Sequence, residues 1–364
     1  MSSLRNRRCS GIGLAVSAVA VLLGALPASA TAVTPRDGRD RNPGMVRYRG
    51  PIEHIFVHPL LPSPRYTLHK GTQPREFNKW NITAREFRRI VPQLYDNGWV
   101  LVDLESQFRK APTARGVVLK RKPLWLPEGK KPLVLSIDDL NYPQYMVDNH
   151  LNSRLVLDEA GDVASLRVTP KGREVVSRRA EVVPIIDRFV EKHPDFSIDG
   201  AKGVIALTGA EGILGYRTTG DGRRARREQR RVAPIVQRLR QTGWTFGSHS
   251  FAHPDMSTSE LAAVRNDTRK WERYVEPLLG RNTRVYVYPY GAPLPSGSAG
   301  LALLRRAGFR IFCSISPVAR LIASGPYVLQ DRVRVDGLAL LSQPRTLERF
   351  FDPQSVVDPV RPRL

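Results

Sequence analysis

The chain has 364 residues, of which 41% are hydrophobic, and it carries a formal net charge of +23 from 57 Lys and Arg against 34 Asp and Glu. This length allows one large domain or two ordinary ones, with enough apolar residues for a sizeable core. So basic a balance favours anionic partners such as nucleic acid, acidic lipid surfaces or wall polymers. The sequence contains no zinc-finger pattern and no aromatic-rich ribonucleoprotein motif, which argues against a nucleic-acid-binding module.

The N-terminus has the pattern of a secretory signal peptide. Three arginines in the first eight residues precede an apolar stretch over 11–26, and a small-x-small cleavage site ends at Ala30. We expect cleavage there, which leaves a secreted, extracellular or cell-wall-associated protein without a membrane span. The alternative is an uncleaved anchor, for which the apolar stretch is short. The mature charge would be 54 − 34 = +20. Export makes nucleic acid an improbable partner and an anionic cell-wall polymer a better one.

The next segments predict the start of a parallel α/β fold. Residues 31–50 are rich in Arg, Pro, Gly and Asp and are typical of a flexible linker. A short strand follows over 51–59, and a capping box at Thr83 predicts the start of a helix. Residues 99–104 predict a second strand, and this alternation of helix and strand is typical of a parallel sheet.

The apolar run that begins at Lys131 ends in two adjacent carboxylates, Asp138 and Asp139. It predicts a buried strand of the parallel type. Two acids at the carboxyl end of such a strand lie where α/β folds place catalytic groups. The alternative is a solvated, Asp-rich turn.

The remaining elements continue the alternation after a long excursion over about 140–230. The excursion ends in a glycine-rich loop and the very basic helix start at 223–231, which indicates either a polyanion-binding surface or a solvated helix face. Further strands and helices are predicted over 243–247, 257–279, 284–288, 298–307, 309–315 and 327–335. Residues 341–364 are rich in Pro and Arg and are expected to form a peripheral tail.

His249 and His253 lie four residues apart in Gly247-Ser-His-Ser-Phe-Ala-His253. On one face of a helical segment, two such imidazoles could share a metal ion, and Asp139 could supply a carboxylate. The alternative is a pair of surface or capping histidines. The HExxH pattern of zinc proteases is absent, which argues against that class.

Three motifs in order resemble those of the polysaccharide deacetylases, the NodB-homology group of carbohydrate esterase family 4. They are Ser136-Ile-Asp138-Asp139, His249-Ser-x-x-His253 and Tyr288-Pro-Tyr-Gly291, and the last is similar to the form found in exported members. The resemblance covers about 51–340. It implies a distorted (β/α) barrel of the NodB type, with a long insertion at about 140–230 between the first two motifs.

The resemblance also implies a role for each matching residue. Asp138 would be the general base, and a divalent ion, with Zn²⁺ the first choice, would be held by Asp139, His249 and His253. In the third motif, the backbone N–H of Tyr290 would stabilise the oxyanion. Tyr288 and Pro289 would shape the substrate-binding turn, although without the other motifs this would be an ordinary strand end.

The sequence departs from the family pattern at several positions. Leu140 replaces the usual Gly, and Val287 replaces an Arg that pairs with the base. We propose that Arg332 supplies that charge, against the alternative of a surface Arg. No His follows His253, so the usual late general acid is absent.

His58 is the first substitute for that acid, because it ends the first strand on the same face of a barrel, and His150 is the second. A structural role is the alternative for His58.

The sequence therefore predicts a secreted, metal-dependent hydrolase that removes N-acetyl groups from amino sugars of a cell-wall or extracellular polysaccharide. One alternative is a weakly active or inactive glycan-binding protein on the same barrel, which the changes at Leu140 and Val287 favour. Another is a metal-dependent amidase or esterase that acts on a non-sugar substrate.

Overall fold

The computed structural model describes residues 44–114, 116–280 and 283–364. The predicted signal peptide and most of the predicted linker lie outside the described residues. Within the described part of the chain, no helix combines the length and the apolar character needed to cross a bilayer.

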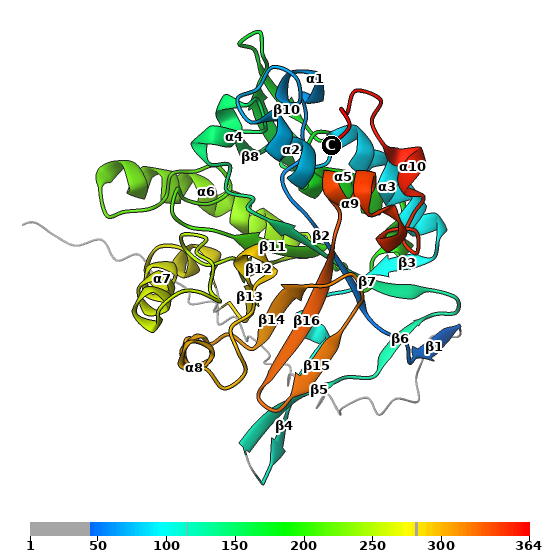
Figure 1. Cartoon of the computed structure of the whole chain (residues 1–364), viewed down its shortest axis with the longest axis vertical. Helices are drawn as coiled ribbons and strands as arrows, with labels where there is room; N and C mark the ends of the chain where they lie inside the picture. The colour runs from blue at the N-terminus through cyan, green and yellow to red at the C-terminus, as the bar shows by residue number, and fades with distance from the viewer. Residues whose placement is uncertain (1–43, 115, 281–282) are drawn as a thin grey trace, which may run out of the picture. The chain divides into compact units, whose positions relative to one another are not determined.

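Seven parallel strands form a closed barrel (Figure 1). In order around the barrel they are β7 (Lys131–Asp138), β11 (Gly203–Leu207), β12 (Trp244–Ser248), β13 (Val285–Val287), β14 (Ile311–Ile315), β16 (Tyr327–Arg334) and β2 (Glu53–Val57). The ring closes because β7 pairs with β2 on one edge and with β11 on the other. The predicted distorted (β/α) barrel is therefore confirmed.

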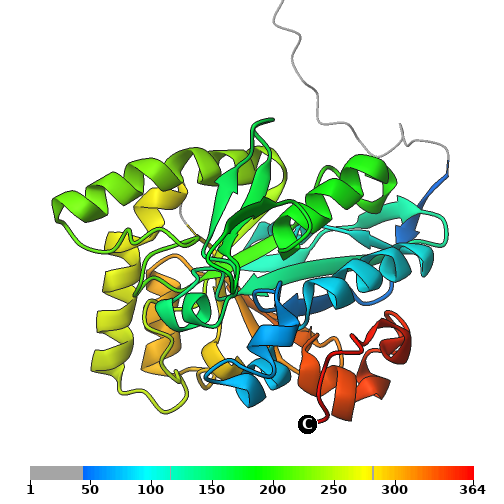
Figure 2. The same ribbon diagram turned by 90° about the horizontal axis from the view of Figure 1, so that it is seen from above.

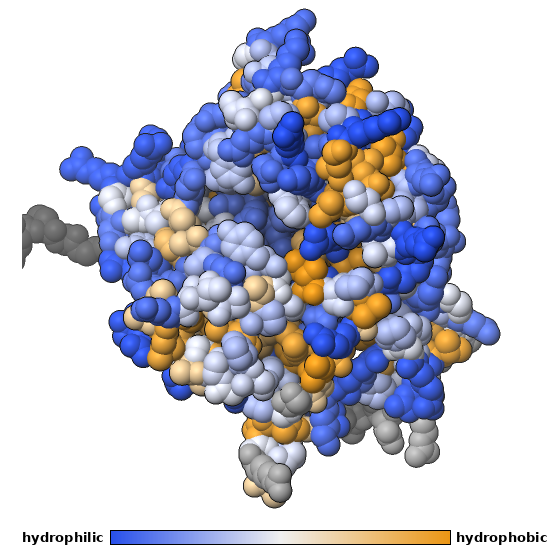
Figure 3. All heavy atoms as spheres, in the orientation of Figure 1, coloured by the Kyte–Doolittle hydropathy of each residue, from blue (hydrophilic) through white to orange (hydrophobic). Residues whose placement is uncertain are grey.

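Helices cover the outside of the barrel (Figure 2). They include α3 (Ala84–Asp96), α5 (Val182–Lys192), α6 (Arg223–Gln241), α7 (Leu261–Tyr274), α8 (Ala299–Arg306) and α9 (Gly337–Ser342). The capping box predicted at Thr83 is present, since its hydroxyl accepts from the N–H of Glu86 and its own N–H donates to the Glu86 carboxylate. Most of the surface seen in Figure 3 is hydrophilic, with smaller hydrophobic patches.

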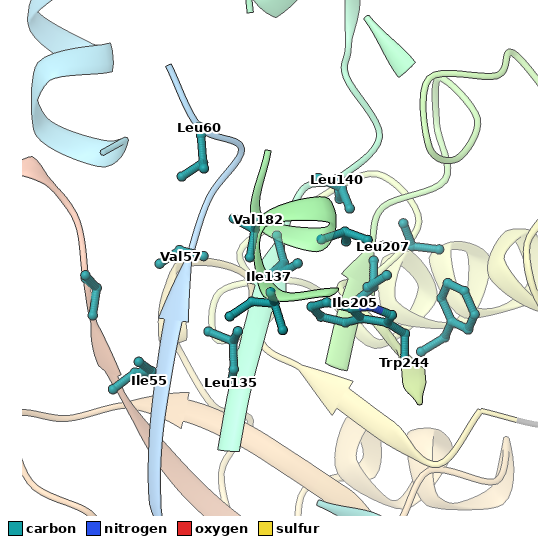
Figure 4. Packing of buried hydrophobic residues seen from close by; sticks show 14 of the residues in the cluster. Ile55, Val57, Leu60, Leu135, Ile137, Leu140, Val182, Ile205, Leu207 and Trp244 are labelled. Carbon is teal, nitrogen blue, oxygen red and sulfur yellow. The ribbon is translucent and has the colours of Figure 1, made fainter. Parts of the chain in front are cut away.

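Alternate residues of the barrel strands point outward into an apolar layer beneath the helices. Figure 4 shows this layer, with Ile55 and Val57 of β2, Leu135 and Ile137 of β7, and Ile205 and Leu207 of β11 packed near Val182 of α5. The residues between them face the interior, because successive strand side chains alternate. The interior is apolar in part, with Val134, Val204, Val285, Cys313 and Val328 in one buried cluster. Asp138 follows Val134 and Ser136 on the inward-facing side of β7, so its carboxylate lies inside the barrel.

Cys313 of β14 belongs to that interior cluster. Burial raises the pKa of its thiol to about 12. The thiol is therefore inert and structural at neutral pH.

The excursion between the first two motifs is only partly additional to the barrel. It begins with α4 (Gln144–Asp148) and a three-stranded antiparallel sheet of β8 (Arg154–Leu157), β9 (Val163–Val168) and β10 (Glu174–Ser177). It then returns to the barrel through α5, β11 and α6. The insertion predicted over about 140–230 therefore includes elements of the barrel. The sequence of an apolar helix and strand within such an excursion does not show which sheet they join.

The linker predicted over 31–50 is wrong for its last residues. Met45–Tyr48 form strand β1, which pairs antiparallel with β6 (Leu124–Pro127). The other elements outside the closed ring are α1 (Pro64–Thr67), α2 (Pro74–Trp80), β3 (Trp99–Leu101), β4 (Phe108–Thr113), β5 (Gly116–Arg121), β15 (Leu321–Ser324) and α10 (Pro353–Val356), and of these β3 pairs with β7. The 3₁₀ turns are Glu105–Gln107, Pro194–Phe196, Glu276–Leu279, Pro289–Gly291 and Pro344–Thr346.

The peripheral tail predicted over 341–364 is also wrong. Phe350 and Phe351 are buried in the apolar layer, and Arg361 is buried against Glu86 of α3, with 2.7 Å between the Nη2 and Oε2 atoms. The Pro- and Arg-rich composition led to this error, because composition does not distinguish an Arg that is paired and buried from one that is solvated.

Candidate metal centre and active-site cleft

The two carboxylates of the first motif separate at the end of β7. Asp138 is the last residue of the strand and is buried. Asp139 has φ +58, in the left-handed region that a non-glycine residue occupies at a cost of about 1–3 kcal/mol. Its N–H donates to the carbonyl oxygen of Ala206 on β11. This turn gives the two neighbouring acids different environments, one inside the barrel and one at its rim.

The two histidines follow β12 in a loop rather than in the helix that the sequence analysis considered. Ser250 and His253 both have positive φ, at +64 and +57. The loop is held by Asp267 of α7, whose carboxylate accepts from the N–H groups of Phe251 and Ala252 at 2.8 Å each. The histidines nevertheless come together, because this tight loop folds His253 back over His249.

The Nδ1–H of His249 donates to the carbonyl oxygen of Val287 at 2.9 Å. That hydrogen bond leaves Nε2 as the lone-pair nitrogen, which is the usual arrangement around a metal-binding imidazole. Burial lowers the pKa of His253, which favours the neutral ring that a metal ion requires. Val287 thus contributes its backbone to the site even though its side chain cannot replace an Arg.

Asp139, His249 and His253 each offer one ligand atom within 4.8 Å of the others. The two Nε2 atoms are 3.1 Å apart, and the Asp139 Oδ2 lies 3.9 Å from the His253 Nε2. Two ligands at about 2.0–2.1 Å from a tetrahedral Zn²⁺ have a similar mutual separation. The residues therefore fit a His₂Asp site for a divalent ion.

Arg332 of β16 lies against Asp138. Its Nη1 and Nη2 donate to the two carboxylate oxygens at 2.7 and 2.9 Å, and its side chain is fully buried. Burial alone would raise the pKa of Asp138, but the Arg332 guanidinium holds that pKa well below its usual range. Asp138 is therefore ionised at neutral pH, 3.9 Å from the His249 Nε2. Asp138 and Arg332, which the sequence analysis proposed as a pair, are therefore in contact.

The candidate acids lie in different places. His58 lines the cleft, is half-buried, and has no hydrogen-bond partner for Nδ1 among the described residues. His150 instead packs on Tyr66, with 4.3 Å between the ring centroids, and is not among the described residues that line the cleft. The structure thus brings His58, but not His150, to the site.

The Tyr288–Gly291 turn places its two tyrosines differently. Tyr288 is buried and stacks on Phe312 with 5.9 Å between centroids, so it belongs mainly to the core although it touches the cleft. Pro289 is buried at the start of the turn. Tyr290 has φ +58, is 67% exposed, and packs edge-on to His253 with 4.7 Å between centroids. The turn therefore presents Tyr290 beside the histidines of the candidate metal site.

A cleft of about 830 Å³ is lined by His58, Asp138, Asp139, His249, His253, Tyr288 and Tyr290. Its walls include residues that the sequence analysis missed, among them Trp80, Asn141, Tyr145, Arg334 and Asp336. An aromatic residue on a short helix gives no signal that separates a cleft wall from the core. A larger cavity of about 1040 Å³, lined by Lys122, Arg240 and Trp244 among others, contains none of the predicted site residues.

Several solved structures are similar to this chain. A Streptococcus pyogenes deacetylase, PplD, in complex with acetate is 14% identical, with 83% of this chain and 98% of that chain covered and a TM-score of 0.46. IcaB from Ammonifex degensii is 15% identical, with 82% and 96% covered and a TM-score of 0.44. A de-N-acetylase from Aggregatibacter actinomycetemcomitans is 12% identical, with 81% and 99% covered and a TM-score of 0.46.

No curated protein sequence matches the chain significantly. Residues 216–312 match the family model described as polysaccharide deacetylase. That segment contains both metal-site histidines and the Tyr288–Gly291 turn. Within this segment, which is about a quarter of the chain, the sequence is similar to the polysaccharide deacetylase family.

Proposed function

We propose that the chain is a metal-dependent hydrolase that removes N-acetyl groups from amino sugars of a cell-wall or extracellular polysaccharide. The observation that carries this proposal is the His₂Asp ligand set directly beside a buried, ionised carboxylate, Asp138. A ligand set of this kind and a neighbouring base are the parts that metal-assisted hydrolysis needs. The family match over 216–312 supports the same reaction class.

The chain's own residues can carry the proton transfers of amide hydrolysis. A divalent ion held by Asp139, His249 and His253 would supply Lewis-acid polarisation and lower the pKa of a water molecule. Asp138, kept ionised and oriented by Arg332, accepts a proton from the attacking water. The backbone N–H of Tyr290 donates to the oxygen that gains charge.

The leaving amine needs a proton, and His58 is the group in the cleft that we assign to this step. Water adds to the carbonyl carbon, the C–N bond breaks, and the products are acetate and the free amino sugar. If His58→Ala keeps the wild-type kcat at every pH, the acid is another group.

The proposal is tested by measuring acetate release from acetylated glycans together with metal content by mass spectrometry. Asp138→Asn is expected to keep one divalent ion per chain and to lose about 10²–10⁴-fold in kcat, because the base is gone and the ligands are not. Glu159→Gln, in the exposed turn between β8 and β9, is the matched control and should behave as wild type. A wild-type protein that binds no ion stoichiometrically, or an Asp138→Asn variant at full rate, would contradict the proposal.

A glycan-binding protein with little or no turnover is the second candidate. Both oxygens of Asp138 already accept hydrogen bonds from Arg332. This carboxylate is therefore less available as a base than an unpaired carboxylate would be. Glycan binding without acetate release would favour this candidate. Acetate release from small non-sugar amides or esters, but from no glycan, would instead favour an amidase or esterase.

We also propose that the protein is exported and that its basic surface holds an anionic cell-wall polymer. The support is the signal-peptide pattern, with cleavage after Ala30, and the exposed arginines in the first half of α6. Those arginines are Arg223, Arg224, Arg226, Arg227, Arg230 and Arg231. N-terminal sequencing of the exported protein should begin at Thr31, and a retained N-terminus would contradict cleavage.

A further inference from the structure

The three most exposed aromatic side chains among the described residues all line the active-site cleft. They are Trp80, Tyr145 and Tyr290, which are 40%, 45% and 67% exposed. Large apolar side chains that gather at one exposed place mark binding surfaces more often than chance. The described residues contain many other aromatic rings, which are buried or half-buried. The presence of the three exposed rings in one cleft therefore indicates a ligand-binding surface.

Trp80 is held in one orientation at the end of α2. Its Nε1–H donates to the Glu76 Oε2 at 2.9 Å, one helical turn earlier. The Arg334 guanidinium carbon lies 5.9 Å from the centroid of its ring. The polar edge of the indole is therefore satisfied by the protein, which leaves its exposed apolar surface for contact with a ligand.

The backbone beneath Trp80 is also held firmly. Arg361 donates from Nη1 to the backbone and side-chain oxygens of Asn78 at 2.8 Å each, and from Nη2 to the carbonyl of Asn81 at 2.9 Å. Gly337 of α9 approaches so closely that an added Cβ would lie 1.8 Å from the Asn78 carbonyl oxygen. The ring thus needs little ordering when a ligand binds, which favours affinity.

A second ring extends this aromatic wall toward the metal site. Tyr145 of α4 stacks on Phe77 with 6.1 Å between centroids and 24° between planes. Phe77 and Trp80 lie three residues apart on α2 and so share one face of the helix. Tyr290 packs on His253, so the cleft has aromatic rings both at the reacting centre and along the wall beyond it.

We propose that Trp80, together with Tyr145, forms a sugar-stacking subsite for a residue that neighbours the one being deacetylated. A pyranose ring has apolar C–H faces and a polar rim, which suits a wall of aromatic rings edged by Glu76, Asn81 and Arg334. The cleft volume of about 830 Å³ lies within the range of about 300–1,000 Å³ that encloses ligands larger than one small group. The ligand class is an oligomer of N-acetylated amino sugars rather than a free monosaccharide, and this inference rests on the proposed function.

The test compares Trp80→Ala, Trp80→Phe and Arg75→Ala on two substrates. Arg75 is an exposed residue of α2 that does not line the cleft, so it is the matched control. One substrate is a pentamer of N-acetylglucosamine. Of the β-1,4-linked and β-1,6-linked pentamers, the one that the wild type deacetylates faster is used. The other is 4-nitrophenyl acetate, whose hydrolysis is first shown to require Asp138.

Trp80→Ala should lower kcat/KM on the pentamer by about 10-fold or more, because it removes an aromatic contact, and should leave ester hydrolysis unchanged. Trp80→Phe should recover part of the loss, and Arg75→Ala should match wild type. Equal kcat/KM for Trp80→Ala and wild type on the pentamer would overturn the subsite. An equal loss on both substrates would also overturn it, because the damage would then be general.

Failure of the proposed function is distinguishable from failure of the subsite. If the proposed function is wrong, the wild type releases acetate from neither pentamer. Calorimetric titration with the same pentamers then decides the subsite by itself. Binding that weakens about 10-fold in Trp80→Ala supports it, and equal affinity, or no binding by the wild type, overturns it.

Discussion

Arg332 allows the carboxylate of Asp138 to stay ionised although it is buried. Besides its two bonds to Asp138, it donates to the hydroxyl of Ser136 at 3.0 Å, and its guanidinium carbon lies 4.2 Å from the centroid of Phe56. A buried carboxylate is tolerated only when it is paired and hydrogen-bonded. The charge comes from β16, since Val287 on β13 cannot supply it.

Removing this partner should destabilise the fold as well as the chemistry. Arg332→Met leaves Asp138 buried and unpaired, so we expect a loss of about 3–5 kcal/mol in the free energy of unfolding at pH 7. Adding Asp138→Asn to it should restore part of that loss, because the unpaired charge is then gone. Urea denaturation measures both; equal stability of the single and double variants would contradict the prediction.

The same pair predicts the direction of a pH dependence. Because the folded state depresses the pKa of Asp138, the pair's contribution is present above the ordinary Asp value of about 3.9 and is lost as the pH falls through the folded pKa. The difference in stability between wild type and Arg332→Met should therefore shrink in acid.

At the scale of elements, the C-terminal segment holds α2, which builds part of the cleft wall, against α3. Arg361 joins α2 to α3, since it donates to Asn78 and Asn81 on one side and to Glu86 on the other. Glu86 also completes the capping box at the start of α3, so one buried carboxylate serves both the cap and the C-terminal segment. The segment is thus part of the fold rather than an appendage.

Arg361→Ala should therefore be costly. It leaves Glu86 buried without its cation, and we expect a loss of about 3–5 kcal/mol in the free energy of unfolding. Arg363→Ala, two residues later at an exposed position, is the control and should change stability by less than about 0.5 kcal/mol. Thermal and urea unfolding would contradict the prediction if both variants matched wild type.

At the scale of the whole molecule, the excess of positive charge is unevenly distributed. The first half of α6 exposes six arginines, while its one acid, Glu228, is nearly buried and pairs with Arg231 at 2.8 Å. Such a surface attracts polyanions in a salt-dependent way. This surface lies on the helix that follows, in sequence, the loop carrying the cleft residues Ala210 and Glu211.

We expect a triple variant, Arg223→Gln, Arg227→Gln and Arg230→Gln, to elute from immobilised polyphosphate at a lower salt concentration than wild type. The control removes three exposed cations elsewhere, with Lys171→Gln, Arg173→Gln and Lys192→Gln, so that net charge falls equally. Identical elution of the two triple variants would mean that net charge, not α6, governs binding.

The sequence alone could predict a parallel α/β fold and the strand ends that carry the motifs, whereas the closed barrel was expected only through resemblance to a family. Buried parallel strands have near-continuous apolar runs, so β7, β11 and β14 are recognisable from composition, and the acids and histidines follow strand ends where a barrel gathers them. The sequence also indicated Arg332 as a partner for Asp138, but only through resemblance to a family.

The tertiary structure decided what depends on contacts between distant segments. Asp138 and Arg332 are 194 residues apart, and Arg361 and Glu86 are 275 apart. A local pattern reports periodicity and end signals, but not which strand closes the barrel or which Arg is buried. The cleft wall at Trp80 and the packed C-terminal segment therefore became visible only once the chain had folded, because burial and pairing belong to the whole molecule and not to any one stretch.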